Sequence, residues 1–199
     1  PRPLPDREAS REQLAQITGA PNDTLWIGQV SVLRSWKGHL DLIKAFEILA
    51  PNHSNLRLAL AGEGPYREVL EKRATESTHA SRIHFLGHQN PWWFFRALNA
   101  AILASTKNEG VPQSLMQAMF AETPVIGTDV GGIPEIVSHR NTGLIVPPES
   151  PGLLAKNIEI MLSDKITQRM CVENATSRAR DCFTLERMGK RVEAIMSAR

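Results

Sequence analysis

Short apolar runs alternate with amphipathic stretches along most of the chain. After the first run, Leu40, Ile43, Phe46 and Leu49 recur about one helical turn apart, which predicts a helix with a single apolar stripe. Apolar runs without alternating polar positions are typical of strands buried on both faces, as in a parallel sheet. Six such runs are predicted to be strands: Leu25–Leu33, Leu56–Gly62, Arg82–Leu86, Ala100–Ala104, Pro124–Thr128 and Gly143–Val146.

Helices are predicted between these strands and after the last of them. From Pro151 to Ser197 the pattern is helical only, with breaks near Asp164 and Phe183. Strands that alternate with helices imply a doubly wound α/β fold, a parallel sheet of about six strands covered on both faces, here followed by a helical C-terminal tail. The helices predicted among the strands are residues 37–50, Tyr66–His79, Pro91–Leu98, Gln113–Ala121 and Ile133–Val137.

The first 24 residues differ from the rest of the chain. They hold four prolines and few large apolar groups, which is typical of a linker, with one short helix predicted near Glu8 to Ile17. We therefore expect a domain over residues 25–199, preceded by the remnant of an interdomain linker. Because the chain starts at Pro1 without a methionine, it is expected to be cut from a longer protein.

Composition narrows the classes of ligand. Basic and acidic residues number 23 and 21, the net charge is +2, and no lysine-arginine tract is present, which argues against nucleic-acid binding. An anionic ligand must therefore be held by a few placed cations. The longest apolar runs are as short as Ala100–Ala104, so no segment is predicted to span a bilayer.

The chemically informative residues follow the predicted strands. In a doubly wound sheet, ligands bind beyond the carboxyl ends of the strands. Five strand ends are expected to converge on one crevice, and the residues that follow them are Arg34 and Lys37, Gly62 to Gly64, Gly87, Glu109, and Gly131 with Gly132.

Arg34 and Lys37 lie in a tight turn between the first strand and its helix. A guanidinium, an ammonium group and a helix N-terminus together suit a diphosphate. The alternative is a pair of solvated surface cations. Taken alone, the turn does not distinguish the two.

Glu109 and Gln117 bracket a loop that runs into a helix started by Pro112. A carboxylate can accept hydrogen bonds from sugar hydroxyls, and an amide can bond a ribose diol. Gly131 and Gly132 form a second loop onto a helix N-terminus, where glycine allows the backbone to approach a ligand closely. A solvated glutamate and a plain turn are the alternatives.

Other motifs are weaker. The GEGP segment at Gly62 lacks the third glycine of a dinucleotide-binding loop, which argues against a nicotinamide-dependent dehydrogenase, and there is no P-loop. Among the six histidines only His84 and His88 straddle a strand end, a poor zinc signal. The aromatic run Trp92 to Phe95 is predicted to be core with one exposed edge rather than a stacking platform for a base.

The combination resembles the family 4 glycosyltransferases, retaining enzymes of the GT-B fold, which is built from two Rossmann-like domains. The resemblance runs from about Trp26 to Phe183. It is carried by IGQVSVLRSWKGH, LALAGEGP, IHFLGH, ASTKNEGVPQSLMQAMFAETPVIGTDVGGIPEIV and NTGLIVPP, in the family's order. It implies that this chain is the C-terminal, donor-binding domain.

The resemblance also implies roles for single residues. Arg34 and Lys37 would neutralise the donor diphosphate, and Glu109 would contact hydroxyls of the donor sugar, these three being the catalytic candidates. Gln117 stands where the family usually has a ribose-binding glutamate, a departure that is expected to weaken ribose binding. The other donor-binding candidates are Gly62, Leu86, Gly87, Gly110, Val111, Ser114, Gly131 and Gly132, with the base near Leu86 and Gly87.

The reaction so implied transfers a hexosyl-type sugar from a UDP-sugar or GDP-sugar with retention of anomeric configuration. No cofactor is required, and no metal is demanded because an Asp-x-Asp motif is missing. The acceptor, a glycan or a lipid-linked molecule, would bind the N-terminal domain, so this chain alone is expected to be inactive. Family frequency favours bacterial lipopolysaccharide or surface polysaccharide synthesis. Two other functions stay open: a nucleotide-sugar epimerase of the GT-B fold, and a non-catalytic nucleotide-binding module.

A cytoplasmic location is expected, and peripheral attachment of the full-length enzyme to the inner face of the membrane stays open. It would use basic residues near the end of the chain; the alternative is a solvated helix face. Those residues are Arg178, Arg180, Arg187, Lys190 and Arg191.

Overall fold

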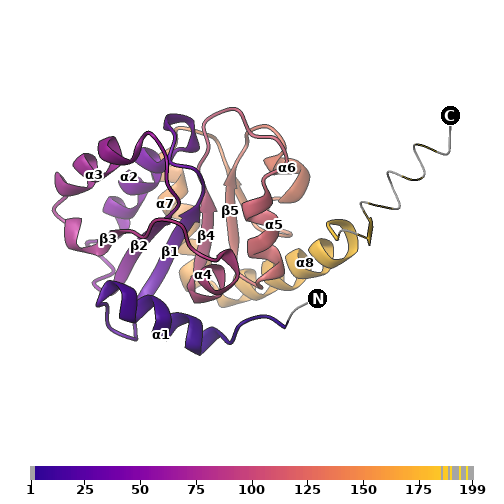
Figure 1. The fold of residues 1–199 in the computed structure, drawn as a ribbon, viewed down its shortest axis with the longest axis horizontal. Coiled ribbons are helices and arrows are strands. Elements are labelled where there is room, and N and C mark those ends of the chain that lie inside the picture. Colours follow the sequence, from indigo (N-terminus) through magenta and orange to yellow (C-terminus); the bar gives the residue numbers. More distant parts are fainter. Residues whose placement is uncertain (1–2, 185, 188, 190–192, 194–195, 197–199) are drawn as a thin grey trace.

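The computed structural model describes residues 3–184, 186–187, 189, 193 and 196. A six-stranded sheet runs through the middle of the molecule, with every neighbouring pair parallel and the strand order β3-β2-β1-β4-β5-β6 (Figure 1). The order reverses between β1 and β4, which is the switch point of a doubly wound sheet. The strands are β1 Leu25–Val30, β2 Leu56–Ala61, β3 Ile83–Phe85, β4 Ala100–Leu103, β5 Val125–Thr128 and β6 Leu144–Val146.

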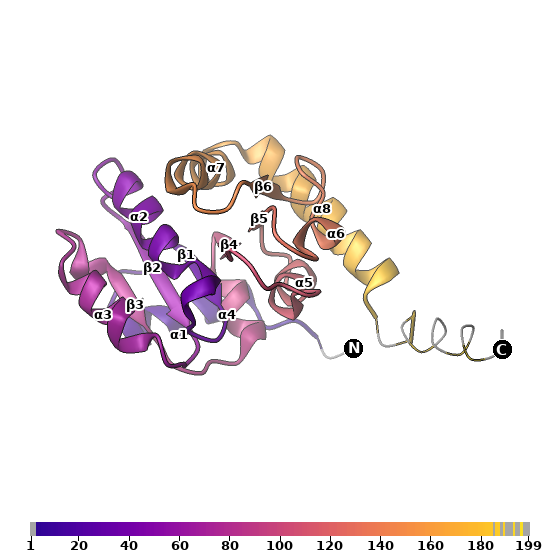
Figure 2. The same cartoon turned by 90° about the horizontal axis from the view of Figure 1, so that it is seen from above.

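Helices cover both faces of the sheet, with α2 and α7 on one side and α1, α4 and α5 on the other (Figure 2). The helices are α1 Arg7–Thr18, η1 Ser35–Lys37, α2 His39–Leu49, α3 Arg67–Thr75, η2 Ala80–Arg82, α4 Pro91–Ala97, α5 Gln113–Phe120, α6 Ile133–Ile136, α7 Pro151–Ser163 and α8 Lys165–Cys182. The predicted α/β fold class is confirmed.

Alternate strand residues feed two separate cores. In β2, Leu58 and Leu60 pack with α2 and α7, whereas Ala59 and Ala61 pack with the helices of the opposite face. Both sets are buried, which explains why the strands read as continuous apolar runs. The aromatic run behaves as predicted, because Trp93, Phe94 and Phe95 are buried and Trp92 is exposed.

The predicted breaks in the tail have local causes. Asp164 accepts hydrogen bonds from the amides of Ile166 and Thr167, so it caps α8 and separates it from α7. Helix α8 ends at Cys182, next to the predicted break at Phe183. Most of the helix predicted beyond that point lies outside the described residues.

The segment assigned to a linker carries a packed helix. Helix α1 lies against α4, and its Leu14 is buried. The Arg11 guanidinium donates to the Thr24 carbonyl and to Asn99 Oδ1, which fixes the helix at the amino ends of β1 and β4. The domain boundary at residue 25 stays a prediction.

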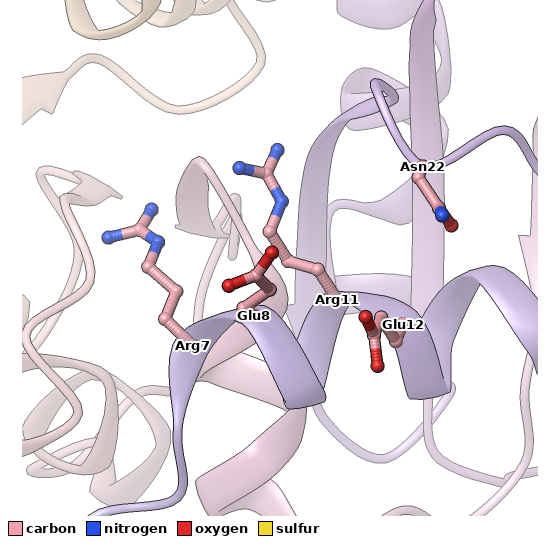
Figure 3. A pocket seen from close by; sticks show the side chains of 5 residues that line it. All are labelled: Arg7, Glu8, Arg11, Glu12 and Asn22. Carbon is pink, nitrogen blue, oxygen red and sulfur yellow. The ribbon is translucent and has the colours of Figure 1, made fainter.

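A hollow of about 360 Å³ opens along α1, at the edge of the sheet opposite the predicted site. In Figure 3 Arg7 and Arg11 point the same way from the helix, with Glu8 between them. Glu12 and Asn22 complete the lining. The hollow thus holds as many acidic as basic side chains, an arrangement that does not favour an anion.

Three of the basic residues near the chain end contact the protein itself, and one of them, Arg187, donates to the Asp181 carbonyl. Arg178 donates to the carbonyls of Glu135 and Ile136 at the end of α6, and Arg180 pairs with Glu122. Lys190 and Arg191 lie outside the described residues. Among the described residues, none of the helices combines the length and the hydropathy of a transmembrane span.

Candidate functional site

Two predicted site residues meet at the switch point of the sheet. Lys37 belongs to η1, which follows β1, and Glu109 belongs to the loop after β4. Lys37 Nζ lies 2.5 Å from Glu109 Oε1, and the side chains are 19% and 5% exposed respectively. The Ser105 hydroxyl donates to the same carboxylate oxygen. A nearly buried carboxylate is thus held by an ammonium and a hydroxyl group.

The turn that carries Lys37 is fastened to the end of β4. Gly38 has φ +68°, and a Cβ there would lie 1.7 Å from the Ala104 carbonyl oxygen, so only glycine fits. The Thr106 amide donates to the Trp36 carbonyl at 2.8 Å. These contacts fix the backbone of η1 relative to the loop that carries Glu109.

Arg34 lies at the start of the same turn with an exposed side chain. Its guanidinium carbon lies 5.1 Å from the centroid of the Trp36 ring, a cation–π contact. The stacking orients the guanidinium and leaves its N–H groups accessible. Arg34 and Lys37 therefore lie on one turn, as predicted, but only Lys37 bonds to Glu109.

The loop after β5 packs on the loop after β4. Gly131 has φ +53°, and a Cβ there would lie 1.9 Å from the Glu109 carbonyl oxygen. The Gly132 amide donates to that same oxygen at 3.3 Å. The Gly131–Gly132 pair is therefore required for this close packing, and Gly110 and Val111 are left exposed beside it.

The ends of β2 and β3 are joined by backbone hydrogen bonds. The Gly62 amide donates to the Gly87 carbonyl at 2.7 Å, and the Leu86 amide donates to the Leu60 carbonyl. The Gln89 side chain donates to the Leu86 carbonyl at 2.6 Å. Because these bonds engage the Leu86 amide, that group is not available to read a base.

Helix α5 begins beside the Glu109 loop. It starts after Pro112, as predicted, and carries the half-buried Ser114 and Gln117 three positions apart on one face. Among the described residues, no hydrogen bond joins Gln117 to the Lys37–Glu109 pair. The structure thus places Gln117 in the middle of α5 without joining it to that pair.

A buried polar network that was not predicted from the sequence lies beneath η1. Gln29 is fully buried in β1, and its side chain bonds to Ser31 Oγ, the Lys37 carbonyl and the Ala104 amide. His39 Nε2 lies 3.0 Å from Ser31 Oγ. The sequence did contain a signal for this network, because Gln29 is a polar residue within the apolar run of a predicted buried strand.

Burial lowers the pKa of His39 to about 4. A hydrogen bond with the Arg34 backbone opposes this shift because it favours the charged ring, and the nearby charge of Lys37 adds to the shift. The ring is therefore neutral at pH 7, and with Nδ1 protonated its Nε2 can accept a hydrogen bond from the Ser31 hydroxyl. Within the described residues, no group of three or more His, Cys, Asp or Glu side chains is placed to hold a metal ion.

Comparison with protein families gives one match over most of the chain. The pattern of the family described as "Glycosyl transferases group 1" matches residues 10–178. The D-inositol 3-phosphate glycosyltransferase of Corynebacterium glutamicum is 31% identical over 88% of this chain and 44% of its own length. The capsular polysaccharide biosynthesis glycosyltransferase CapM of Staphylococcus aureus is 25% identical over 87% of this chain and 46% of its own. The chain thus spans less than half the length of these curated relatives.

Solved structures share the fold. Anabaena Alr3699/HepE, crystallised with UDP-glucose, superimposes with a TM-score of 0.88 at 23% identity, over 96% of this chain and 53% of its own. The C-terminal domain of a group 1 family glycosyl transferase, LpcC of Francisella tularensis, gives a TM-score of 0.80 at 22% identity. That match covers 92% of this chain and 95% of that domain. The fold is therefore that of a C-terminal glycosyl transferase domain.

Proposed function

Because the chain belongs to the glycosyl transferases group 1, we propose that the crevice between β1 and β4 binds the nucleoside-diphosphate sugar donor of a retaining glycosyl transfer. One observation carries this proposal: Lys37 and Glu109, which are far apart in sequence, form an ion pair at the carboxyl ends of the central strands. Ligands of doubly wound sheets bind at this position.

The diphosphate is assigned to the η1 turn. Lys37 and Arg34 supply two cations of different geometry, and the N-terminus of α2 begins at the next residue, where its amides favour an anion. As the bond between sugar and diphosphate breaks, negative charge grows on the departing phosphate. Cations fixed beforehand stabilise that charge without reorganisation.

The sugar is assigned to Glu109 and to the Gly131–Gly132 loop that packs on it. Binding of the diphosphate draws Lys37 toward phosphate, and the carboxylate then accepts hydrogen bonds from sugar hydroxyls. Ser114 and Gln117 are assigned to the ribose side. The base is assigned to the end of β3. There the Gly87 amide can donate a hydrogen bond to it, and backbone carbonyl oxygens can accept hydrogen bonds from it.

UDP is the first nucleotide to test, since HepE was crystallised with UDP-glucose; a GDP-sugar is the other. The relation to CapM, a capsular polysaccharide biosynthesis glycosyltransferase, supports a role in surface polysaccharide synthesis. The acceptor, a glycan or lipid-linked molecule, is assigned to a further domain, because the chain spans less than half of its relatives.

Calorimetric titration of the chain with UDP, UDP-glucose and GDP tests the proposal. We expect one nucleotide to bind, and Lys37→Ala and Arg34→Ala to weaken that binding about tenfold or more, since charge-assisted hydrogen bonds contribute about 1.5–3 kcal/mol. Lys156→Ala, which removes an exposed cation from α7, is the matched control. Equal affinity in all variants, or no binding at millimolar nucleotide, contradicts the proposal.

Gln117 supports one other candidate, a non-catalytic nucleotide-binding module, because a neutral amide replaces the usual carboxylate. The two functions differ in the role of Glu109. In a full-length enzyme, Glu109→Ala abolishes transfer while nucleotide binding is largely retained. If the full-length protein binds donor but wild type and variant alike transfer nothing, the module is the correct function.

A further inference from the structure

A single buried amide connects the backbone segments that meet at the site. Gln29 is 0% exposed and lies in β1. Its Oε1 accepts a hydrogen bond from the Ala104 amide at 3.2 Å, at the end of β4. Its Nε2 donates to the Lys37 carbonyl at 2.8 Å and to Ser31 Oγ at 3.0 Å. The side chain thus joins β1, η1 and the start of the loop to Glu109.

The partners of Gln29 require both hydrogen-bonding roles of an amide. The Ala104 amide needs an acceptor and the Lys37 carbonyl needs a donor, and no apolar or ionised side chain of this length supplies both. His39 closes the network from α2, because its Nε2 lies 3.0 Å from Ser31 Oγ and 3.3 Å from Gln29 Nε2. Polar groups buried this deeply keep their geometry because an unpaired group is costly there.

We propose that Gln29 is a positioning residue, which holds the Lys37 backbone so that the ammonium group meets the donor diphosphate; this inference rests on the proposed function. The Lys37 side chain bonds to Glu109 and its carbonyl to Gln29, so the bond to Gln29 still holds the backbone when the diphosphate draws the ammonium group away. Without the amide donor, the Lys37 carbonyl loses this hydrogen bond and the end of η1 is held less firmly, although the Thr106–Trp36 bond remains. The Lys37 ammonium group then leaves the phosphate position, although nothing in direct reach of the ligand has been changed.

Two substitutions separate this role from general stability. Gln29→Met keeps the length of the side chain and removes every hydrogen bond. Gln29→Glu keeps the acceptor for Ala104 and, when ionised, lacks the donor for Lys37. Gln168→Met is the matched control, because Gln168 also donates to a main-chain carbonyl, that of Met161, but lies on α8. All variants are compared at a temperature where their circular dichroism matches that of wild type.

The readout is UDP affinity in wild-type and Lys37→Ala backgrounds. We expect Gln29→Met and Gln29→Glu each to weaken binding about tenfold in the wild-type background. With Lys37→Ala already present, the same changes should weaken binding less than about twofold, since Gln29 acts through Lys37. Gln168→Met should leave affinity unchanged in both backgrounds.

The inference is overturned if both Gln29 variants bind UDP like wild type, or if their effect is as large in the Lys37→Ala background, because Gln29 then acts by another route. If Lys37→Ala itself leaves nucleotide binding unchanged, the proposed function fails, and this inference with it. These two failures are distinguishable because the Lys37→Ala variant alone decides the second.

Discussion

At position 117 an amide lies where a carboxylate is usual, and the difference is testable. A charge-assisted hydrogen bond to a ribose hydroxyl is worth about 1 kcal/mol more than a neutral one. Gln117→Glu is therefore expected to strengthen UDP binding about fivefold. Calorimetric titration measures it, with Gln113→Glu, an exposed position on the same helix, as control. An unchanged or weaker affinity would place the ribose away from residue 117.

His39 makes stability depend on pH. Its pKa is about 4 in the folded protein and 6.5 when solvated, so on acidification the unfolded chain takes up the proton first. The stabilisation is complete above pH 6.5 and is lost as the pH falls toward 4, at about 1.4 kcal/mol per unit.

We expect urea unfolding to show a loss of about 3 kcal/mol between pH 6.5 and 4 that His39→Gln removes. His84, whose pKa burial also lowers to about 4, is present in both proteins, so the difference between their slopes reports His39 alone. An equal pH dependence of the unfolding free energy in both proteins would show that the pKa of His39 is the same in the folded and the unfolded chain.

Single residues also show how far the sequence leads toward the site. That Lys37 and Glu109 meet at one edge of the sheet could be predicted, because the residues that follow parallel strands converge there. Their part in donor binding, and that of Arg34, stays a prediction. Side-chain packing decides that Lys37 Nζ bonds to Glu109 whereas Arg34 stacks on Trp36, and the spacing of residues in the sequence does not contain this information. Gln29 was missed because a pattern of apolar positions carries no information about which buried groups need a hydrogen-bond partner.

Among the elements, those with a clear period or a cap were predicted closely. Helix α2 followed from its apolar stripe and the start of α8 from Asp164. The first strand was predicted three residues too long. The strand ends at Val30, although Leu33 continues the apolar run and its amide still donates to the Glu63 carbonyl just beyond β2. An apolar run alone therefore does not locate the end of a strand.

Helix α1 was predicted, but its attachment to the sheet domain was not. Leu14 is 0% exposed and Ile17 is 49% exposed on the same helix. Leu14→Ala is expected to lower the free energy of unfolding by about 3 kcal/mol, and Ile17→Ala by less than about 0.5 kcal/mol. Urea unfolding measures both. Since α1 lies at the edge of the sheet opposite the candidate site, the UDP affinity of the folded variants should be unchanged. If Leu14→Ala and Ile17→Ala destabilise the protein equally, α1 is not packed as described.

In the molecule as a whole, the two edges of the sheet have different roles. At the amino ends of β1 and β4, Arg11 ties α1 to the sheet. At the carboxyl ends, Lys37, Glu109 and the glycine loops form the candidate site. The fold class followed from the strand–helix alternation alone, and the carboxyl edge of the sheet stays the predicted ligand edge. Stability and binding are therefore expected to be separable by mutation, except at the buried network of Gln29 and His39, which lies under the site itself.

The exposed residues of the candidate site lead to a prediction about activity. Arg34, Gly110 and Gly131 are exposed, and Val111 is 54% exposed, so one wall of the candidate site faces solvent. Transfer requires an acceptor held in line with the anomeric carbon, and such positioning is worth about 7–11 kcal/mol of barrier. This chain is therefore expected to bind donor and to transfer negligibly, as NMR of the anomeric proton of UDP-glucose would show. Adding a polypeptide with the remaining segment of a full-length enzyme should restore transfer, with the donor's anomeric configuration kept in the product. Rapid transfer by this chain alone would instead mean that it holds the acceptor as well, and that its exposed wall is an acceptor site.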